Sequence, residues 1–183
     1  MKQEPRSIPR LIPSRAFPSY AFVPGLSAHP THNPQGHSYN RVEEEIEAPD
    51  PKRWKNNEHY LYGIDLFNYG YYWEAHEIWE DLWNADGRIG LPSDFLKGLI
   101  KLAAAGVKAR EGVRRGLQAH ARGAALLFEA VLSKQTGPDA RYMGLSLKEL
   151  HQFARSLAKT GAPLQPHTDD ADPIVFDLIL SPQ

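Results

Sequence analysis

The residues that could do chemistry concentrate in one run, WEAHEIWEDLW, at positions 73–83. His76 and Glu80 are four residues apart in it, so on a helix their side chains stand one turn above each other. An imidazole and a carboxylate at that spacing could bind one divalent metal ion, with Glu77 as a general base or a further ligand. The pattern shares the first His-Glu of the metalloprotease HExxH motif but lacks its second histidine. Two ligands on one helix do not complete a metal site, so a third would have to come from another segment.

The best candidate for that third ligand is His120, which falls on the apolar arc of a later helix and is expected to face the core. A lone histidine on an apolar face is more commonly a core residue whose ring nitrogens bond a carbonyl or a carboxylate. In the same way, His76, Glu77 and Glu80 could form a metal or catalytic site, or a structural hydrogen-bond network between helices. The sequence leaves these alternatives open.

Two lysines bear on the metal hypothesis. Lys97 and Lys101 belong to the polar stripe of an otherwise apolar helix. If that stripe faces Glu77 and Glu80, the ammonium groups neutralise the carboxylates and no metal ion is needed. If it faces water, the lysines are ordinary solvated side chains, which is the commoner outcome.

Three of the eight histidines, His29, His32 and His37, fall within nine residues of a proline-rich stretch near the N-terminus. They are either chance neighbours in a turn-rich tract or a ligand cluster, and His29 and His37 are retained as candidate site residues. Ser38 follows the last of them. It has no strand-turn-helix context, so the sequence gives no support for nucleophilic serine chemistry.

The elements that must position these residues are predicted from apolar periodicity as helices at about 53–68, 71–85, 93–110, 113–135 and 145–159. Gly70 lies in the turn between the first two, where glycine can take a positive φ. The third helix is apolar on most sides and is expected at the centre, with Gly98 allowing close approach of a neighbour. The tryptophans, Trp79 among them, are expected to pack in the core. The predicted fold is all-α: a compact bundle of about five helices with an extended proline-rich N-terminal strap.

The chain is expected to have three parts. Residues 1–51 hold nine of the 15 prolines and form a largely non-regular arm and strap. Residues 52–160 form the helical bundle domain. Residues 161–183 form a C-terminal tail that packs on the bundle.

Composition excludes several classes of function. The formal net charge of -1 gives no basic footprint, so no nucleic acid partner is expected. The absence of cysteine removes disulfides, thiolate nucleophiles and cysteine zinc sites. The apolar runs fall short of the roughly 20 residues of a membrane span, so no membrane partner is expected and a cytoplasmic location is predicted. The sequence identifies no partner; a homo-oligomer is compatible with it.

Three segments resemble one known family: LFNYGYYWEAHEIWEDLW, FLKGLIKLAAAGVKAR and RRGLQAHARGAALL. From Tyr60 to Val131 the chain resembles the domain of unknown function 309 family, and the elements VPG, HP and GHSY resemble the leader of a bacterial subset. The resemblance implies a small helical bundle, and members have sometimes been labelled metal-dependent hydrolases. The family motif falls here on Trp73, Glu74, Ala75, His76, Glu77, Glu80, Trp83 and Gly98. Where the family commonly has glutamine, this chain has Lys97 and Lys101, which argues against a cation site facing that helix.

Two functional hypotheses follow. In the first, the protein is a metal-dependent hydrolase with His76, Glu80 and His120 or a strap histidine as ligands and Glu77 as base. In the second, it is a non-catalytic helical interaction module or small-ligand-binding module, and the His/Glu motif is a structural hydrogen-bond network. Gly70 and the two residues Tyr72 and Ala75 match part of the tetratricopeptide signature, but only once, so a repeat solenoid is not expected.

Overall fold

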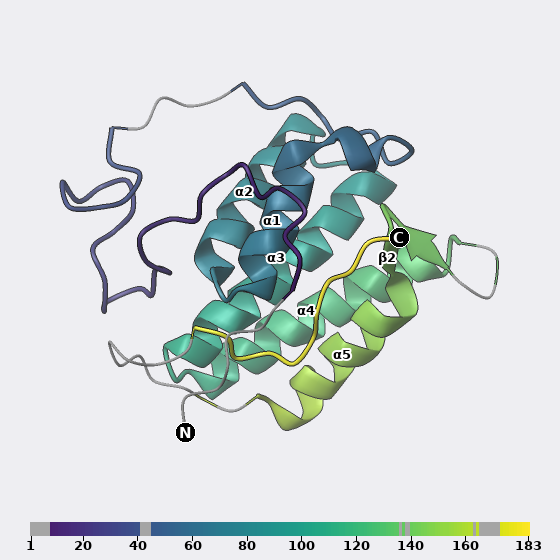
Figure 1. Ribbon diagram of the computed structural model, residues 1–183. Coiled ribbons are helices and arrows are strands. Elements are labelled where there is room, and N and C mark those ends of the chain that lie inside the picture. The colour runs from purple at the N-terminus through teal and green to yellow at the C-terminus, as the bar shows by residue number, and fades with distance from the viewer. Residues whose placement is uncertain (1–7, 41–44, 136, 138–139, 163, 165–172) are drawn as a thin grey trace.

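The computed structural model describes residues 8–40, 45–135, 137, 140–162, 164 and 173–183. In these ranges the chain forms five α-helices, a short 3-10 helix and one two-stranded antiparallel hairpin (Figure 1). The elements are η1 (Trp54–Asn56), α1 (Glu58–Asn68), α2 (Tyr72–Ala85), α3 (Leu91–Arg110), α4 (Arg114–Leu132), β1 (Arg141–Tyr142), β2 (Leu145–Ser146) and α5 (Leu147–Thr160). The prediction of a compact all-α bundle of about five helices is confirmed.

Local sequence signals explain where the helices begin and turn. Asn57 caps α1 by accepting a backbone N–H three residues on, at 2.8 Å, and Ser146 caps α5 in the same way at 3.3 Å. A side-chain cap of this kind stabilises a helix by about 1 kcal/mol. Between α1 and α2 the chain turns at Gly70, which has a φ of +83°. A Cβ at Gly70 would lie 2.6 Å from the carbonyl carbon of Pro173, so both the backbone angle and the packing require glycine.

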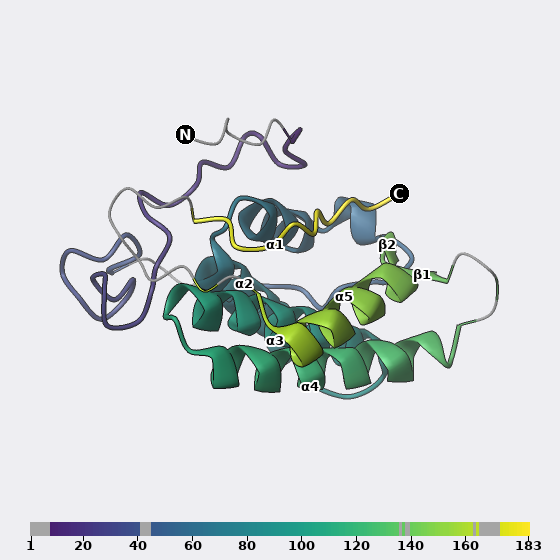
Figure 2. The same ribbon diagram turned by 90° about the horizontal axis from the view of Figure 1, so that it is seen from below.

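Helix α3 lies between α2 and α4, while α1 packs on α2 and α5 packs on α4 (Figure 2). Thirteen of the 20 residues of α3 are buried, as its nearly continuous apolar pattern predicts. Two glycines let aromatic rings touch its backbone. A Cβ at Gly98 would lie 2.6 Å from Cε1 of Phe128, and a Cβ at Gly106 would lie 2.5 Å from Cγ of Tyr72. At Gly98 the absent side chain therefore makes room for an aromatic ring of α4.

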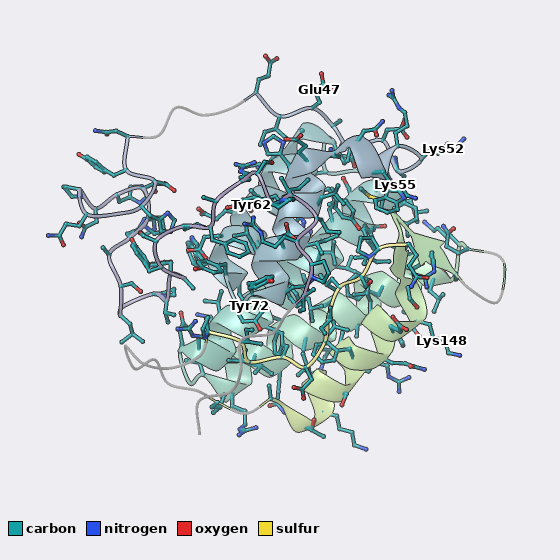
Figure 3. All side chains as sticks on the ribbon, in the orientation of Figure 1. Glu47, Lys52, Lys55, Tyr62, Tyr72 and Lys148 are labelled. Atoms are coloured by element: carbon teal, nitrogen blue, oxygen red, sulfur yellow. The ribbon has the colours of Figure 1, made fainter. Side chains whose placement is uncertain are left out.

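Residues 8–40, here called the strap, contain no helix or strand and cross the outer side of α1 and the start of α2 (Figure 1). Asp65 of α1, only 2% exposed, accepts the successive backbone N–H groups of Leu11 and Ile12, both at 2.8 Å. Tyr62, labelled in Figure 3, donates its hydroxyl proton to a carbonyl of the same segment at 2.8 Å. Buried polar groups of α1 thus fix the first part of the strap.

Residues 173–183, for which the sequence allowed a strand or a short helix, form neither. Tyr72, beside this segment in Figure 3, accepts two of its successive N–H groups at 3.1 and 3.3 Å. Asn68 exchanges two hydrogen bonds with the backbone of Leu180, at 2.8 and 2.9 Å. Phe176 and Leu180 are each 3% exposed in the same core as the helices. The segment therefore packs along α1 and the start of α2.

Helix bounds differ from the predicted ones by a few residues. Helix α1 begins at Glu58 rather than near 53, because η1 precedes it, and α4 ends at Leu132 rather than 135. The short hairpin before α5 was not predicted. No helix in the described part of the chain is long and apolar enough to cross a membrane.

Candidate functional site

The first turns of α2 carry a buried carboxylate, Glu74. On the helix it lies away from the arc of Ala75 and Trp79 that faces the core, yet it is only 7% exposed. The strap causes this burial: Oε1 of Glu74 accepts the backbone N–H of Phe22 at 2.9 Å and lies 3.0 Å from Nε2 of His37. A carboxylate in the first turn of a helix is also favoured by the helix dipole. Glu74 therefore joins the strap to α2.

The His37 imidazole is bonded on both sides. Its Nδ1 lies 2.9 Å from the hydroxyl oxygen of Ser38. When the carboxylate of Glu74 holds the proton on Nε2, Nδ1 is an acceptor and the serine hydroxyl donates to it. The chain Ser38–His37–Glu74 thus fixes the tautomer of His37 and the rotamer of Ser38.

Trp73 separates the strap from the rest of α2. Its ring meets Phe22 edge-on at 4.8 Å and His29 at 6.0 Å, and on the other side lies 5.7 Å from the ring of His76. His29 in turn places its Nδ1 3.1 Å from Nδ1 of His32 on the exposed side of the strap. Burial and the neighbouring His32 lower the pKa of His29. His29 and His37, the two strap candidates, therefore point to different partners.

His76 and Glu80 come together as the four-residue spacing predicted. Nε2 of His76 lies 3.9 Å from Oε2 of Glu80, which is 46% exposed, so the pair is a weak one. Burial lowers the pKa of His76, and Glu80 offsets part of that decrease. Nδ1 of His76 is buried and has no hydrogen-bond partner among the described residues.

Glu77 occupies a half-buried position on the same turn. Burial raises its pKa, and the carboxylates of Asp81, Glu74 and Glu80 raise it further. The indole of Trp73 offsets part of this increase, although its N–H makes no hydrogen bond of normal geometry. A carboxyl group with a raised pKa can exchange protons nearer neutral pH than an exposed one.

The lysine stripe of α3 faces its two neighbouring helices. Nζ of Lys97 lies 4.9 Å from the ring centre of Trp83 on α2. The stem of Lys101 packs over Gly123 of α4, where a Cβ would lie 2.8 Å from its Cδ. Lys108 pairs with Glu111 just beyond the end of the helix. We call the half-buried surface formed by these lysines with His76, Trp83 and His120 the polar seam.

His120 lies in the polar seam rather than in the core, where the sequence placed it. Burial is the largest cause of the lowered pKa of His120. The charges of Lys101, Lys108 and His76 lower this pKa further, and Glu111 raises it. His120 is therefore near enough to His76 for their charges to interact, and Lys101 and Lys108 of α3 are cationic neighbours as well. Among the described residues, no group of three or more histidine, aspartate or glutamate side chains is arranged to hold a metal ion.

The fold and these contacts define a class: a small helical bundle whose second helix carries a His/Glu motif between an N-terminal strap and a seam of lysines. Residues 60–119 match the family model described as Domain of unknown function (DUF309). The matched segment extends from α1 into α4 and contains the whole motif on α2. No curated protein matches the chain. Function must accordingly be argued from the geometry.

Two contacts of the site were missed by the sequence reasoning. Glu74 was singled out as a motif residue without a partner, and it proves to be the acceptor for Phe22 and His37. Asp65 was not singled out, although a buried aspartate within an apolar helix is a signal that some backbone N–H needs an acceptor.

Proposed function

We propose that the protein is a helical module that binds a small ligand beside the first half of α2, without metal-dependent catalysis. The ligand would lie against the polar seam, with Trp73 and Trp83 as apolar walls. The strap would close the opposite side of α2.

One observation supports this proposal above the others. Three buried polar atoms of α2 lack a hydrogen-bond partner among the described residues: Nε1 of Trp73, Oε2 of Glu74 and Nδ1 of His76, the last of which belongs to the polar seam. A buried polar atom left without a partner costs about 1–3 kcal/mol, so native proteins retain few of them. Three such atoms within four residues, on a helix that presents half-buried histidine and tryptophan side chains, are typical of a surface completed by a bound molecule or water.

A metal-dependent hydrolase remains the competing prediction. His76 and Glu80 supply two ligands, and Glu77 has the raised pKa that suits a base. Its weakness is the lysine stripe. A cation placed between His76 and His120 would lie near the ammonium group of Lys101, which already lowers the pKa of His120. Like charges at such a site oppose metal binding.

The test compares metal content and ligand response on the same protein. Elemental analysis is performed on wild type reconstituted with zinc or manganese, beside the double variant His76→Ala/Glu80→Ala. The proposal expects background metal in both proteins. About one metal ion per chain in the wild type, lost in the double variant, would favour the hydrolase instead.

Ligand binding is read from the indole N–H signals of the four tryptophans in a nitrogen-correlated NMR spectrum. Small molecules that bind the seam should move the signals of Trp73 and Trp83. Trp54, which packs against Gly144 beside the hairpin, is the internal control. A broad set of metabolite-sized compounds that moves neither signal would contradict the proposal.

A further inference from the structure

We infer that the polar seam binds the phosphate group of a small molecule, with Lys97 and Lys101 as its cationic contacts. This inference rests on the proposed function and names the chemical class of the ligand.

The first reason is that two ammonium groups of α3 are not neutralised by the protein. Among the described residues, Lys97 and Lys101 form no ion pair, whereas Lys108 in the same stripe pairs with Glu111. The amine of Lys97 lies 4.9 Å from the ring centre of Trp83. A half-buried ammonium group loses part of its hydration, so an anion that contacts it gains more than it would at a fully exposed lysine.

The second reason is the packing of the Lys101 side chain on Gly123 of α4. Gly123 of α4 has no side chain, and the Lys101 stem occupies that space, with Nζ 3.4 Å from the position a Cβ would take. The Lys101 stem therefore lies against α4 and places its amine on the turn next to His120.

The third reason is spacing. Lys97 and Lys101 are separated by four residues, or roughly 6 Å along the helix axis. Lys97 leans toward Trp83 of α2 and Lys101 toward Gly123 of α4, so the phosphate is placed between the two stems. A monocarboxylate would neutralise only one of them. A phosphate monoester carries about two charges near neutral pH and three acceptor oxygens, which matches two ammonium groups.

The acidic groups that the structure describes around the seam do not pair with Lys97 or Lys101. On α2 they are Glu77 and Glu80, and Glu80 is directed to His76 and half exposed. At the α4 end Glu111 is occupied by Lys108. Neutral imidazoles at His76 and His120 can each donate one N–H to a phosphate oxygen.

The experiment uses three probes that share an aromatic ring and differ in charge: phenyl phosphate, benzyl alcohol and benzylamine. Each is titrated into the full-length protein while the indole signals of Trp73 and Trp83 are followed. Variants Lys97→Gln and Lys101→Gln are measured beside Lys148→Gln, which removes an exposed lysine of α5, labelled in Figure 3. Thermal melts establish that all three variants are folded.

We expect phenyl phosphate to move both indole signals in a saturable way, and each seam variant to weaken its binding by about tenfold. The Lys148→Gln variant should bind as the wild type does. Unchanged affinity in Lys101→Gln, or no response to phenyl phosphate, would overturn the inference. If benzyl alcohol or benzylamine binds while phenyl phosphate does not, the phosphate inference fails and ligand binding stands. If none of the three probes moves either signal, the phosphate inference fails and the proposed function loses its support at the seam.

Discussion

Nε2 of His37 lies 3.0 Å from Oε1 of Glu74, and both side chains are only 7% exposed. The two residues are 37 positions apart, and Oε1 also accepts the backbone N–H of Phe22. One carboxylate oxygen on α2 thus holds two points of the strap. Glu74, which the family resemblance marked only as a motif residue, is therefore a structural acceptor.

Removing this acceptor should loosen the strap. Glu74→Ala leaves the N–H of Phe22 and the imidazole of His37 without their partner, at a cost of about 1–3 kcal/mol. For a chain of this length we expect the melting temperature to fall by roughly 2–10 °C. Chymotrypsin should cleave faster at Phe22, because that residue is buried while the strap is in place.

The matched control for this change is Glu129→Ala, on the exposed side of α4. It should leave both the melt and the rate of strap cleavage unchanged. Equal cleavage of Glu74→Ala and wild type would show that the aromatic contacts of Trp73, rather than the carboxylate, hold the strap.

A second anchor fixes the beginning of the strap. Asp65, 2% exposed, accepts two successive N–H groups and lies 3.6 Å from Nε of Arg10. Asp65→Ala should destabilise the protein by about 2 kcal/mol or more, since it leaves two amides and a guanidinium group without this acceptor. Trypsin should then cut faster after Arg10 and Arg15, with Asp94→Ala as the control. Cleavage at the wild-type rate would contradict the assignment of Asp65 as an anchor.

Much of the bundle was predictable because it depends on local periodicity. The apolar spacing in α2 and the long apolar run of α3 both indicate α-helices, and therefore an all-α fold. The N-cap at Ser146 was also predictable from the sequence, because the backbone N–H that it accepts belongs to Glu149, three residues further on. The two-residue strands β1 and β2 are too short to show a period, so the hairpin could not be predicted.

The candidate site was predictable only within one helix. The spacing of His76 and Glu80 placed them together, as found at 3.9 Å. The contact between Glu74 and His37 depends on the path of an irregular strap, which no periodicity encodes. His120 was predicted to lie in the core because it falls on the apolar arc of its own helix. That arc does not reveal that Lys101 and Lys108 of the neighbouring helix α3 lie near its side chain.

Two glycines offer a matched test of packing. Gly98→Ala places a Cβ against the rigid ring of Phe128, whereas Gly123→Ala meets the flexible stem of Lys101. Gly98→Ala should cost about 1–3 kcal/mol by overpacking, measured by urea unfolding. Gly123→Ala should cost little, because alanine favours the helix and the lysine can move. Similar losses in both variants would show that Lys101 is as fixed as Phe128.

The free energy of unfolding should depend on pH through the titration of His76 and His120. The folded pKa values of His76 and His120 lie below 6.5, so the unfolded chain binds more protons in the interval beneath that value. Their contribution to stability is therefore complete above about pH 7 and is lost as the pH falls through 6.5. Glu77 acts in the opposite sense: its raised pKa contributes stability at low pH that is lost as the pH rises through its folded value.

Urea unfolding of wild type, His76→Gln and Glu77→Gln at several pH values separates these effects. Between about pH 7.5 and 5.5 the unfolding free energy of the wild type should decrease, with each histidine contributing at most about 1.4 kcal/mol per pH unit. His76→Gln should flatten the profile, since glutamine takes up no proton. Glu77→Gln should gain stability relative to wild type at the upper end, because burying a neutral amide avoids the cost of the ionised carboxylate. If the unfolding free energy of His76→Gln varied with pH in parallel with that of the wild type, other groups would cause the pH dependence. Removing this imidazole would then leave the number of protons taken up on unfolding unchanged.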